Sequence, residues 1–312
     1  MVKMVFGDSF ILDEVILRAL SIIPTLQVLT GGTIRLGTSE VLNFGDGFCA
    51  LGSLTLKGAS TDLCTVLNDL PRSKLYSLTL SFTNSDGQFA AVAAHLPDTL
   101  TQYASTFCAP LGSDPMAVMD LIKPLLSKMP MLDDFRVVAE KSALSVANDD
   151  LILLGDAWPH LTRLTIRQCT TGPRSNLPDA RRPLNVSGLA ELARRCPKLT
   201  MLSLPELDAS KPAEPRPAPF LGHRLKQLCF QGASSAPARA LNEAAVAINI
   251  MFPHLELHEM QPRAKCPAKV DAAWAHIWNT LEIMRWGRRD YILSERGCES
   301  AVPEVPEMAS DL

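Results

Sequence analysis

The stretch WPHLTRLTIRQC, residues 158–169, contains three apolar residues at the spacing apolar-x-x-apolar-x-apolar: Leu161, Leu164 and Ile166. Arg163, Thr165 and Arg167 alternate with the last two of these. Such alternation predicts a short strand with one buried face and one face in water. Proline cannot continue a helix and pushes its predecessor toward an extended backbone, so the Trp-Pro pair predicts that a helix ends just before the strand.

The same spacing recurs along the chain. It is found in LGSLTL (51–56), LYSLTL (75–80), LDDFRV (132–137), LTRLTI (161–166), LTMLSL (199–204) and LKQLCF (225–230). The first residues of these segments are separated by 24, 57, 29, 38 and 26 positions. The interval of 57 has room for one more, degraded unit, and LTQYAST beginning at Leu100 is the candidate for it.

Prolines recur with the strands. They stand in IPTL (23–26), MPML (129–132), WPHL (158–161), CPKL (196–199) and FPHL (252–255), each after a segment with helical periodicity. The unit is therefore a helix, a proline stop, a short strand and a loop, with a length in or somewhat above the range of leucine-rich repeats. One unit cannot bury its own apolar face, but stacked units share a continuous core. Helical crossovers make the strands parallel, and a solenoid follows.

An ordinary α/β sandwich also alternates strands and helices. Its parallel strands are buried on both faces and read as continuous apolar runs. Here polar residues alternate with the leucines, as Ser77, Thr79 and Ser81 do in the segment LYSLTLS. The sequence thus favours an α/β leucine-rich-repeat solenoid, a horseshoe arc with parallel strands on the concave face and helices on the convex face.

In these W/C/F-P-x-L-x-x-L-x-L units, residues 10–260 resemble the leucine-rich-repeat region of divergent, fungal-type F-box proteins. The resemblance implies a substrate-recognition array of a cullin-based ubiquitin ligase, with a cullin-ligase adaptor as a further partner. An F-box would precede the repeats as a Leu-Pro-led segment of three helices. No such segment is found, since the chain begins with a repeat-like helix followed by IPTLQVL.

The chain divides into three parts by pattern. Residues 1–262 form the irregular repeat array. Residues 263–298 hold an amphipathic helix with Trp274 and Trp278, which we expect to cap the last repeat. Residues 299–312 carry acidic residues and no basic one, which predicts a disordered tail. Two proline-containing insertions, 170–183 and 205–219, lengthen loops after strands; loop drift and a partner-binding role both remain open for them.

Composition narrows the classes of function. A net charge of −3 gives no electrostatic case for nucleic acid, and an aromatic content of 6% gives few stacking platforms. No stretch approaches the roughly 20 apolar residues that span a bilayer, and no signal peptide is recognised. The eight cysteines lie far apart and beside apolar runs, which is typical of buried thiols in a reducing compartment. We expect an intracellular protein, cytoplasmic or nuclear.

No catalytic, cofactor-binding or metal-binding motif is found. His254 and His258 share a strand face but lie about 13 Å apart, too far for one zinc ion. Cys169 and Cys196 have arginine but no histidine nearby in sequence, so structural roles fit them better. The chain is therefore expected to be a protein-binding module without cofactors and not an enzyme. The alternatives are an enzyme with an unrecognised site at the arginine-rich loop 170–183, an isolated scaffold, or a gene fragment.

The predicted contact residues are polar positions that alternate with core leucines. Arginine is enriched at binding hot spots, which directs attention to the arginine-bearing positions. The candidates for binding a protein partner on the concave face are Arg136, Arg163, Arg167, Gln227 and Gln231.

Overall fold

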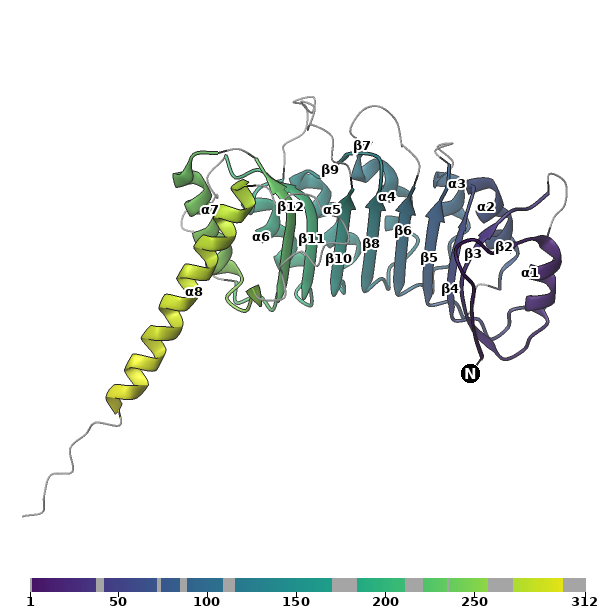
Figure 1. Cartoon of the computed structure of the whole chain (residues 1–312), viewed down its shortest axis with the longest axis horizontal. Helices are drawn as coiled ribbons and strands as arrows, with labels where there is room; N and C mark the ends of the chain where they lie inside the picture. Colours follow the sequence, from purple (N-terminus) through teal and green to yellow (C-terminus); the bar gives the residue numbers. More distant parts are fainter. Residues whose placement is uncertain are drawn as a thin grey trace, which may run out of the picture.

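The computed structural model describes residues 2–37, 42–71, 74–84, 89–108, 116–169, 184–210, 221–234, 236–257 and 272–299. Strands stand side by side along the long axis of the molecule, and helices form a second layer behind them (Figure 1). Every strand pair is parallel, because a helix or a loop carries the chain back between strands. The predicted leucine-rich-repeat solenoid is confirmed.

Within the described residues the main sheet has ten strands. They are β1 (Val2–Val5), β2 (Ile11–Leu12), β3 (Leu26–Ile34), β4 (Ser53–Gly58), β5 (Ser77–Phe82), β6 (Gln102–Phe107), β8 (Asp134–Ala139), β10 (Arg163–Gln168), β11 (Met201–Leu207) and β12 (Gln227–Ala233). They follow one another in sequence order, except that β1 and β2 both pair with β3. A separate pair, β7 (Met116–Ala117) and β9 (Leu144–Ser145), forms a small second sheet.

The helices are α1 (Glu14–Ser21), α2 (Ser60–Asp69), α3 (Phe89–Ala94), α4 (Val118–Leu126), α5 (Asn148–Ala157), α6 (Val186–Arg195), α7 (Ala238–Met251) and α8 (Ala272–Glu299). The proline stops act as predicted. Trp158, Cys196 and Phe252 cap α5, α6 and α7 with nearly the same backbone angles, and each cap is followed by proline. Each cap N–H donates to the carbonyl oxygen four residues earlier, at 2.8–2.9 Å. After α5 and α6 the chain then turns directly into β10 and β11. After α7 the described residues 252–257 form no strand, so the strand face expected to carry His254 is not found there.

The core is built from columns of side chains that run across the sheet. One column, in which each residue lies opposite the next on adjacent strands, consists of Leu29, Leu54, Leu78, Tyr103, Phe135, Leu164, Leu202 and Leu228. All of these residues are at most 2% exposed. The apolar side chains of each strand are thus covered by those of the neighbouring strands and by the helix layer. In this way a repeat that cannot bury its own apolar face becomes stable.

The degraded unit predicted at Leu100 is real and contains β6. Tyr103 and Ser105 occupy core positions that are leucines in β4 and β5, and both are buried. A buried serine in a leucine column weakens the sequence pattern without removing the strand. This is why the unit is visible only as a gap in the spacing.

One local prediction needs correction. The sequence pattern begins the array with a helix, but a strand, β1, precedes that helix. Gly31 and Gly32 lie inside β3, where the pairing with β4 shifts register. Both have positive φ, and a Cβ on Gly31 would lie 2.1 Å from the carbonyl oxygen of Phe6. Residue type is therefore dictated by the backbone there.

The start of α6 is capped by Asn185. Its side chain accepts hydrogen bonds from the N–H groups of Ser187 and Gly188. Asn148, at the start of α5, exchanges two hydrogen bonds of 3.0 Å with Asn185. One asparagine pair therefore ties neighbouring repeats together at their helix starts.

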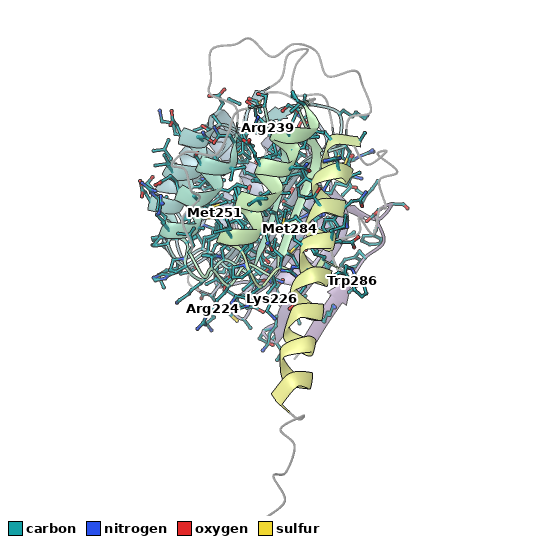
Figure 2. All side chains as sticks on the ribbon, turned by 90° about the vertical axis from the view of Figure 1, so that its left-hand side faces the viewer. Arg224, Lys226, Arg239, Met251, Met284 and Trp286 are labelled. Atoms are coloured by element: carbon teal, nitrogen blue, oxygen red, sulfur yellow. The ribbon has the colours of Figure 1, made fainter. Side chains whose placement is uncertain are left out.

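The two ends of the array differ. At the C-terminal end, α8 lies across α7 and β12, with Met284 on the side toward Met251 and Trp286 on the opposite side (Figure 2). Trp274, Ile277 and Leu281 of α8 are buried there. At the N-terminal end large apolar side chains are exposed, namely Val5, Phe10, Ile11, Val15 and Ile22, and on α8 Ile283 and Trp286 are exposed as well. The predicted division at residue 263 and the tail beyond Glu299 fall outside the described residues.

The core column makes a direct prediction about stability. Replacing Leu78 with alanine removes a fully buried side chain, so we expect the free energy of unfolding to fall by about 2–5 kcal/mol. Thr79→Ala, the neighbouring residue on the other face of β5, is the matched control and should cost less than about 1 kcal/mol. Urea denaturation of both variants measures the difference. Equal losses would contradict the one-sided burial of the strand.

His223 makes a prediction about pH. It is buried, Nε2 lies 3.0 Å from the carbonyl oxygen of Cys196, and Nδ1 accepts a hydrogen bond from the N–H of Leu225. Burial lowers the pKa of His223 below 6.5. The neutral ring is therefore the stable form in the folded state, and its stabilisation is complete above about 6.5 and is lost as the pH falls below that value.

We expect the unfolding free energy of the wild type to decrease between about pH 7 and pH 5. His223→Gln should flatten this decrease, whereas His160→Gln, on an exposed turn, should retain it. Thermal denaturation across the pH range is the measurement. A decrease that is the same in both variants would exclude His223 as its source.

Candidate functional site

The side of the sheet that faces away from the helices, here called the strand face, carries every second residue of each strand. On β4, β5 and β6 these residues are mostly small, half-buried and hydroxyl-bearing: Ser53, Thr55, Ser77, Thr79, Ser81 and Thr106. The wet face predicted from this alternation is present on these strands. These short side chains provide hydrogen-bonding groups and project little above the sheet.

On β8 and β10 the strand face becomes basic. Arg136 lies on β8, and Arg163 and Arg167 lie on β10. Arg136 is opposite Thr165, midway between the two arginines of β10. Arg136 and Arg163 are exposed, and Arg167 is half-buried. Three of the five predicted contact residues are thus brought together by the pairing of two adjacent strands.

Arg163 has an internal partner. Its guanidinium lies 2.8 Å from a carboxylate oxygen of Asp134 on β8, and its side chain remains 50% exposed. Burial raises the pKa of Asp134 despite the opposing effect of Arg163, so desolvation of this carboxylate outweighs the gain from pairing. An ion pair this open to solvent contributes little to stability. Asp134 therefore positions the guanidinium of Arg163, and half of the Arg163 side chain remains accessible to solvent.

Arg167 extends toward β11. Its Nε donates a hydrogen bond of 2.9 Å to the hydroxyl of Ser203, which is fully buried. Thr165 is also buried, although its position in the sequence predicts exposure. The reason at Ser203 is that the long side chain of a neighbouring strand covers a short one. The C-terminal half of the strand face is thus lined by long side chains rather than by bare sheet.

The two glutamines lie apart from the arginines, on β12. Gln227 is half-buried and lies opposite Met201 of β11, which in turn lies opposite Arg163 of β10. The side chain of Gln231 forms hydrogen bonds with the backbone of the sheet. Its amide oxygen accepts from the N–H of Gln168 at 2.8 Å, and its amide nitrogen donates to the carbonyl oxygen of the same residue.

The cause of this arrangement is Pro205, in the strand between them. Proline has no N–H to donate, and the pairing of β10 with β11 ends at Thr165 and Ser203. Gln231 therefore supplies from β12 the hydrogen bonds that β11 does not. This leaves less of its amide for a partner than the sequence prediction assumed.

Two residues that matter to the site were missed by sequence reasoning: Asp134 and Ser203. Both hold arginines of β10 from other repeats, 29 and 36 positions away in the chain, respectively. The signal was present in the repeat alignment, since both stand at strand-face positions of their own units. It could be used only after the strands were aligned side by side.

Two of the described cysteines are held in the thiol form. Burial raises the pKa of the Cys196 thiol to about 12 and that of Cys229 above its usual value, so neither is a thiolate at neutral pH. Within this part of the chain no cluster of three His, Cys, Asp or Glu side chains is placed to hold a metal ion. The same part has no helix long and apolar enough to cross a membrane. The alternative enzyme site at loop 170–183 falls outside the described residues.

Comparisons with known proteins add little to this picture. No protein-family model matches the chain, and no curated protein matches it. Among solved structures, it is similar to a leucine-rich repeat-containing protein, LegL7, from Legionella pneumophila, with 15% sequence identity and a TM-score of 0.37. The similarity covers 81% of this chain and 89% of that chain.

The role of Gln231 can be tested directly. Gln231→Leu leaves the N–H and carbonyl of Gln168 without their side-chain partner, so we expect a loss of about 1–3 kcal/mol in unfolding free energy and faster hydrogen exchange at the Gln168 amide. Gln102→Leu, on the strand face of β6, is the control and should change neither. Normal protection of Gln168 in Gln231→Leu would show that another group satisfies this backbone.

Proposed function

We propose that the protein is a protein-binding module and that the strand face is its binding surface. The observation that carries this proposal is the preformed sheet of β4–β12. Its strand-face positions hold hydroxyl groups on β4–β6 and arginines on β8 and β10, on a backbone fixed by a continuous core. A partner that binds such a surface loses little free energy in ordering the protein.

The residues proposed to contact the partner are Arg136, Arg163, Arg167 and Gln227, with Gln231 in a mainly structural role. Exposed guanidinium groups with planar, directional donors are well suited to recognition of carboxylates and backbone carbonyls. Their hydroxyl-bearing neighbours on β5 and β6 add hydrogen bonds without steric obstruction. The protein is proposed to work without a cofactor.

A finer form of the proposal is that the array selects substrates for a cullin-based ubiquitin ligase. The support for it is the sequence resemblance of the repeat units to those of F-box proteins. It implies an intracellular protein, cytoplasmic or nuclear, that associates with a cullin-ligase adaptor. Recovery of such an adaptor with the tagged protein is the result that would support this form of the proposal.

The test is affinity purification from cells followed by mass spectrometry, with two matched variants. Thr79→Trp places a bulky side chain in the middle of the strand face. Leu153→Trp places the same side chain on the exposed side of α5, in the helix layer. We expect partners of the wild type to be retained by Leu153→Trp and to be depleted at least about tenfold by Thr79→Trp, because only the latter obstructs the sheet.

Circular dichroism and thermal denaturation establish that both variants are folded. Partners lost equally from both variants, or from Leu153→Trp alone, would contradict recognition by the strand face. They would point to the helix layer instead.

A further inference from the structure

The charge on the strand face is opposite in sign to that of the whole chain. From β4 to β10, the strand-face positions of the described strands hold four cations, Lys57, Arg136, Arg163 and Arg167, and one carboxylate, Asp134. Their net charge is +3, whereas the chain carries a formal charge of −3. The surplus is concentrated on two adjacent strands, β8 and β10.

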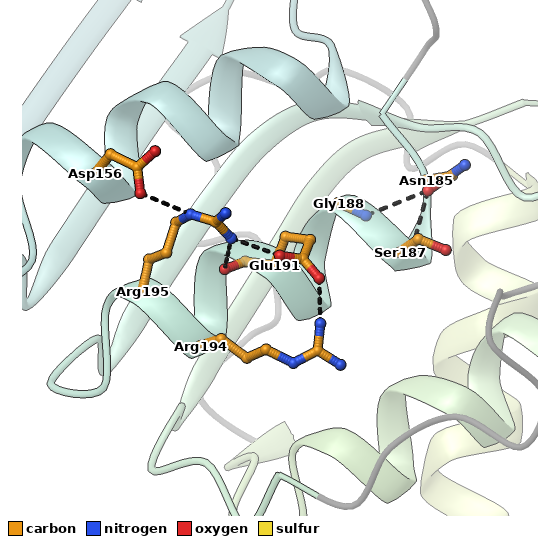
Figure 3. A network of polar contacts seen from close by, with 7 residues as sticks. All are labelled: Asp156, Asn185, Ser187, Gly188, Glu191, Arg194 and Arg195. Carbon is orange, nitrogen blue, oxygen red and sulfur yellow. Dashed lines mark hydrogen bonds and ion pairs between the residues drawn. The ribbon is translucent and has the colours of Figure 1, made fainter.

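The arginines of helix α6, in contrast, are paired with carboxylates of the helix layer. Arg195 of α6 lies 2.8 Å from Asp156 of α5 and also pairs with Glu191, and Arg194 pairs with Glu191 as well (Figure 3). These pairs lower the pKa of Glu191. On the strand face, in contrast, Asp134 lies near both Arg163 and Arg136, and it forms its ion pair with Arg163. The arginines of α6 are thus compensated by carboxylates, whereas cations are in excess on β8 and β10.

The three arginines also have a defined spacing. Arg163 and Arg167 are four residues apart on β10, which places the points where their side chains leave the sheet about 13 Å apart. Arg136 lies between them on the adjacent strand, diagonal to each at about 7–8 Å. In an extended peptide, alternate side chains lie on one face at about 7 Å intervals. The two spacings agree.

We propose that the basic cluster of Arg136, Arg163 and Arg167 binds an extended protein segment with Asp or Glu at alternate positions. This inference rests on the proposed function, since it names the class of partner for the same surface. Three consecutive carboxylates on one side of the segment meet Arg163, Arg136 and Arg167 in turn. Asp134 is an internal competitor, and a carboxylate of the partner replaces it at Arg163.

The probe is a fluorescein-labelled peptide of about nine residues that alternates Glu with Ser, and its counterpart alternates Lys with Ser. Fluorescence anisotropy with the full-length protein measures binding. We expect the glutamate peptide to bind, the lysine peptide not to bind, and the affinity to fall as salt is raised from about 50 to 300 mM. Binding that is equal for both peptides, or independent of salt, overturns the proposal.

Charge reversal locates the site. Arg136→Glu combined with Arg163→Glu should weaken binding of the glutamate peptide by at least about tenfold. The matched control combines Arg224→Glu with Arg239→Glu, which changes the net charge equally at exposed positions away from β8 and β10 (Figure 2). Its affinity should remain close to that of the wild type. Equal weakening in both double variants assigns the effect to net charge and excludes a site at the cluster.

A gain of affinity provides a test that misfolding cannot imitate. Asp134→Asn removes the competing carboxylate while keeping a side chain of similar size, so the glutamate peptide should bind this variant several-fold more tightly. Unchanged or weaker binding by folded Asp134→Asn contradicts the proposal. If partners from cells are lost on Thr79→Trp but the glutamate peptide does not bind, the strand face is a binding surface for a segment of different chemistry.

Discussion

The packing of the apolar side chains of one repeat against those of the next is the interaction on which the rest of the structure depends. No single strand–helix unit has enough apolar neighbours to bury Leu78 or Leu164, and both become solvent-inaccessible only because adjacent units present their own residues at the same register. Register is therefore strongly fixed, since a slip of one position would expose every leucine of the strand. The same constraint places the intervening residues on the strand face, so the core determines where the arginines point.

The fold could be predicted because its signals are local. Pro159 ends a helix and Leu161, Leu164 and Ile166 begin a strand within nine residues, and repetition of that pattern identifies a solenoid. Signals weaken where the units are irregular. The helix α3 has only six residues, mostly alanine, and β6 replaces leucine with Tyr103 and Ser105, so both are poorly marked in the sequence. These elements form because their neighbours require a layer at that place, which is a tertiary effect.

The candidate site could be predicted only as a face, and not as a set of contacts. Alternation placed Arg163 and Arg167 on the exposed side of β10, but their partners Asp134 and Ser203 come from other repeats. Gln231 shows the limit most clearly. A polar residue at an exposed strand position is usually solvated, yet here Pro205, on the strand next to that of Gln168, would leave backbone groups of Gln168 unpaired, and Gln231 satisfies them. This role of Gln231 follows from the sequence of the neighbouring strand β11, and the sequence around Gln231 itself does not reveal it.

The arginines of α6 are paired with carboxylates, whereas the strand face on β8 and β10 has more cations than carboxylates. This difference has a physical consequence for recognition. Arginines of α6 are neutralised locally by Glu191 and Asp156, so these arginines project little field. The strand face keeps a cationic surplus over a rigid sheet, where like charges repel at every pH at which the arginines are charged, which is the whole accessible range. In the complex proposed above, carboxylates that bind between the arginines relieve that repulsion. The cationic surface then attracts the proposed segment before contact and orients it by charge, while the small hydroxyl-bearing residues of β4–β6 allow the rest of the segment to lie close to the sheet.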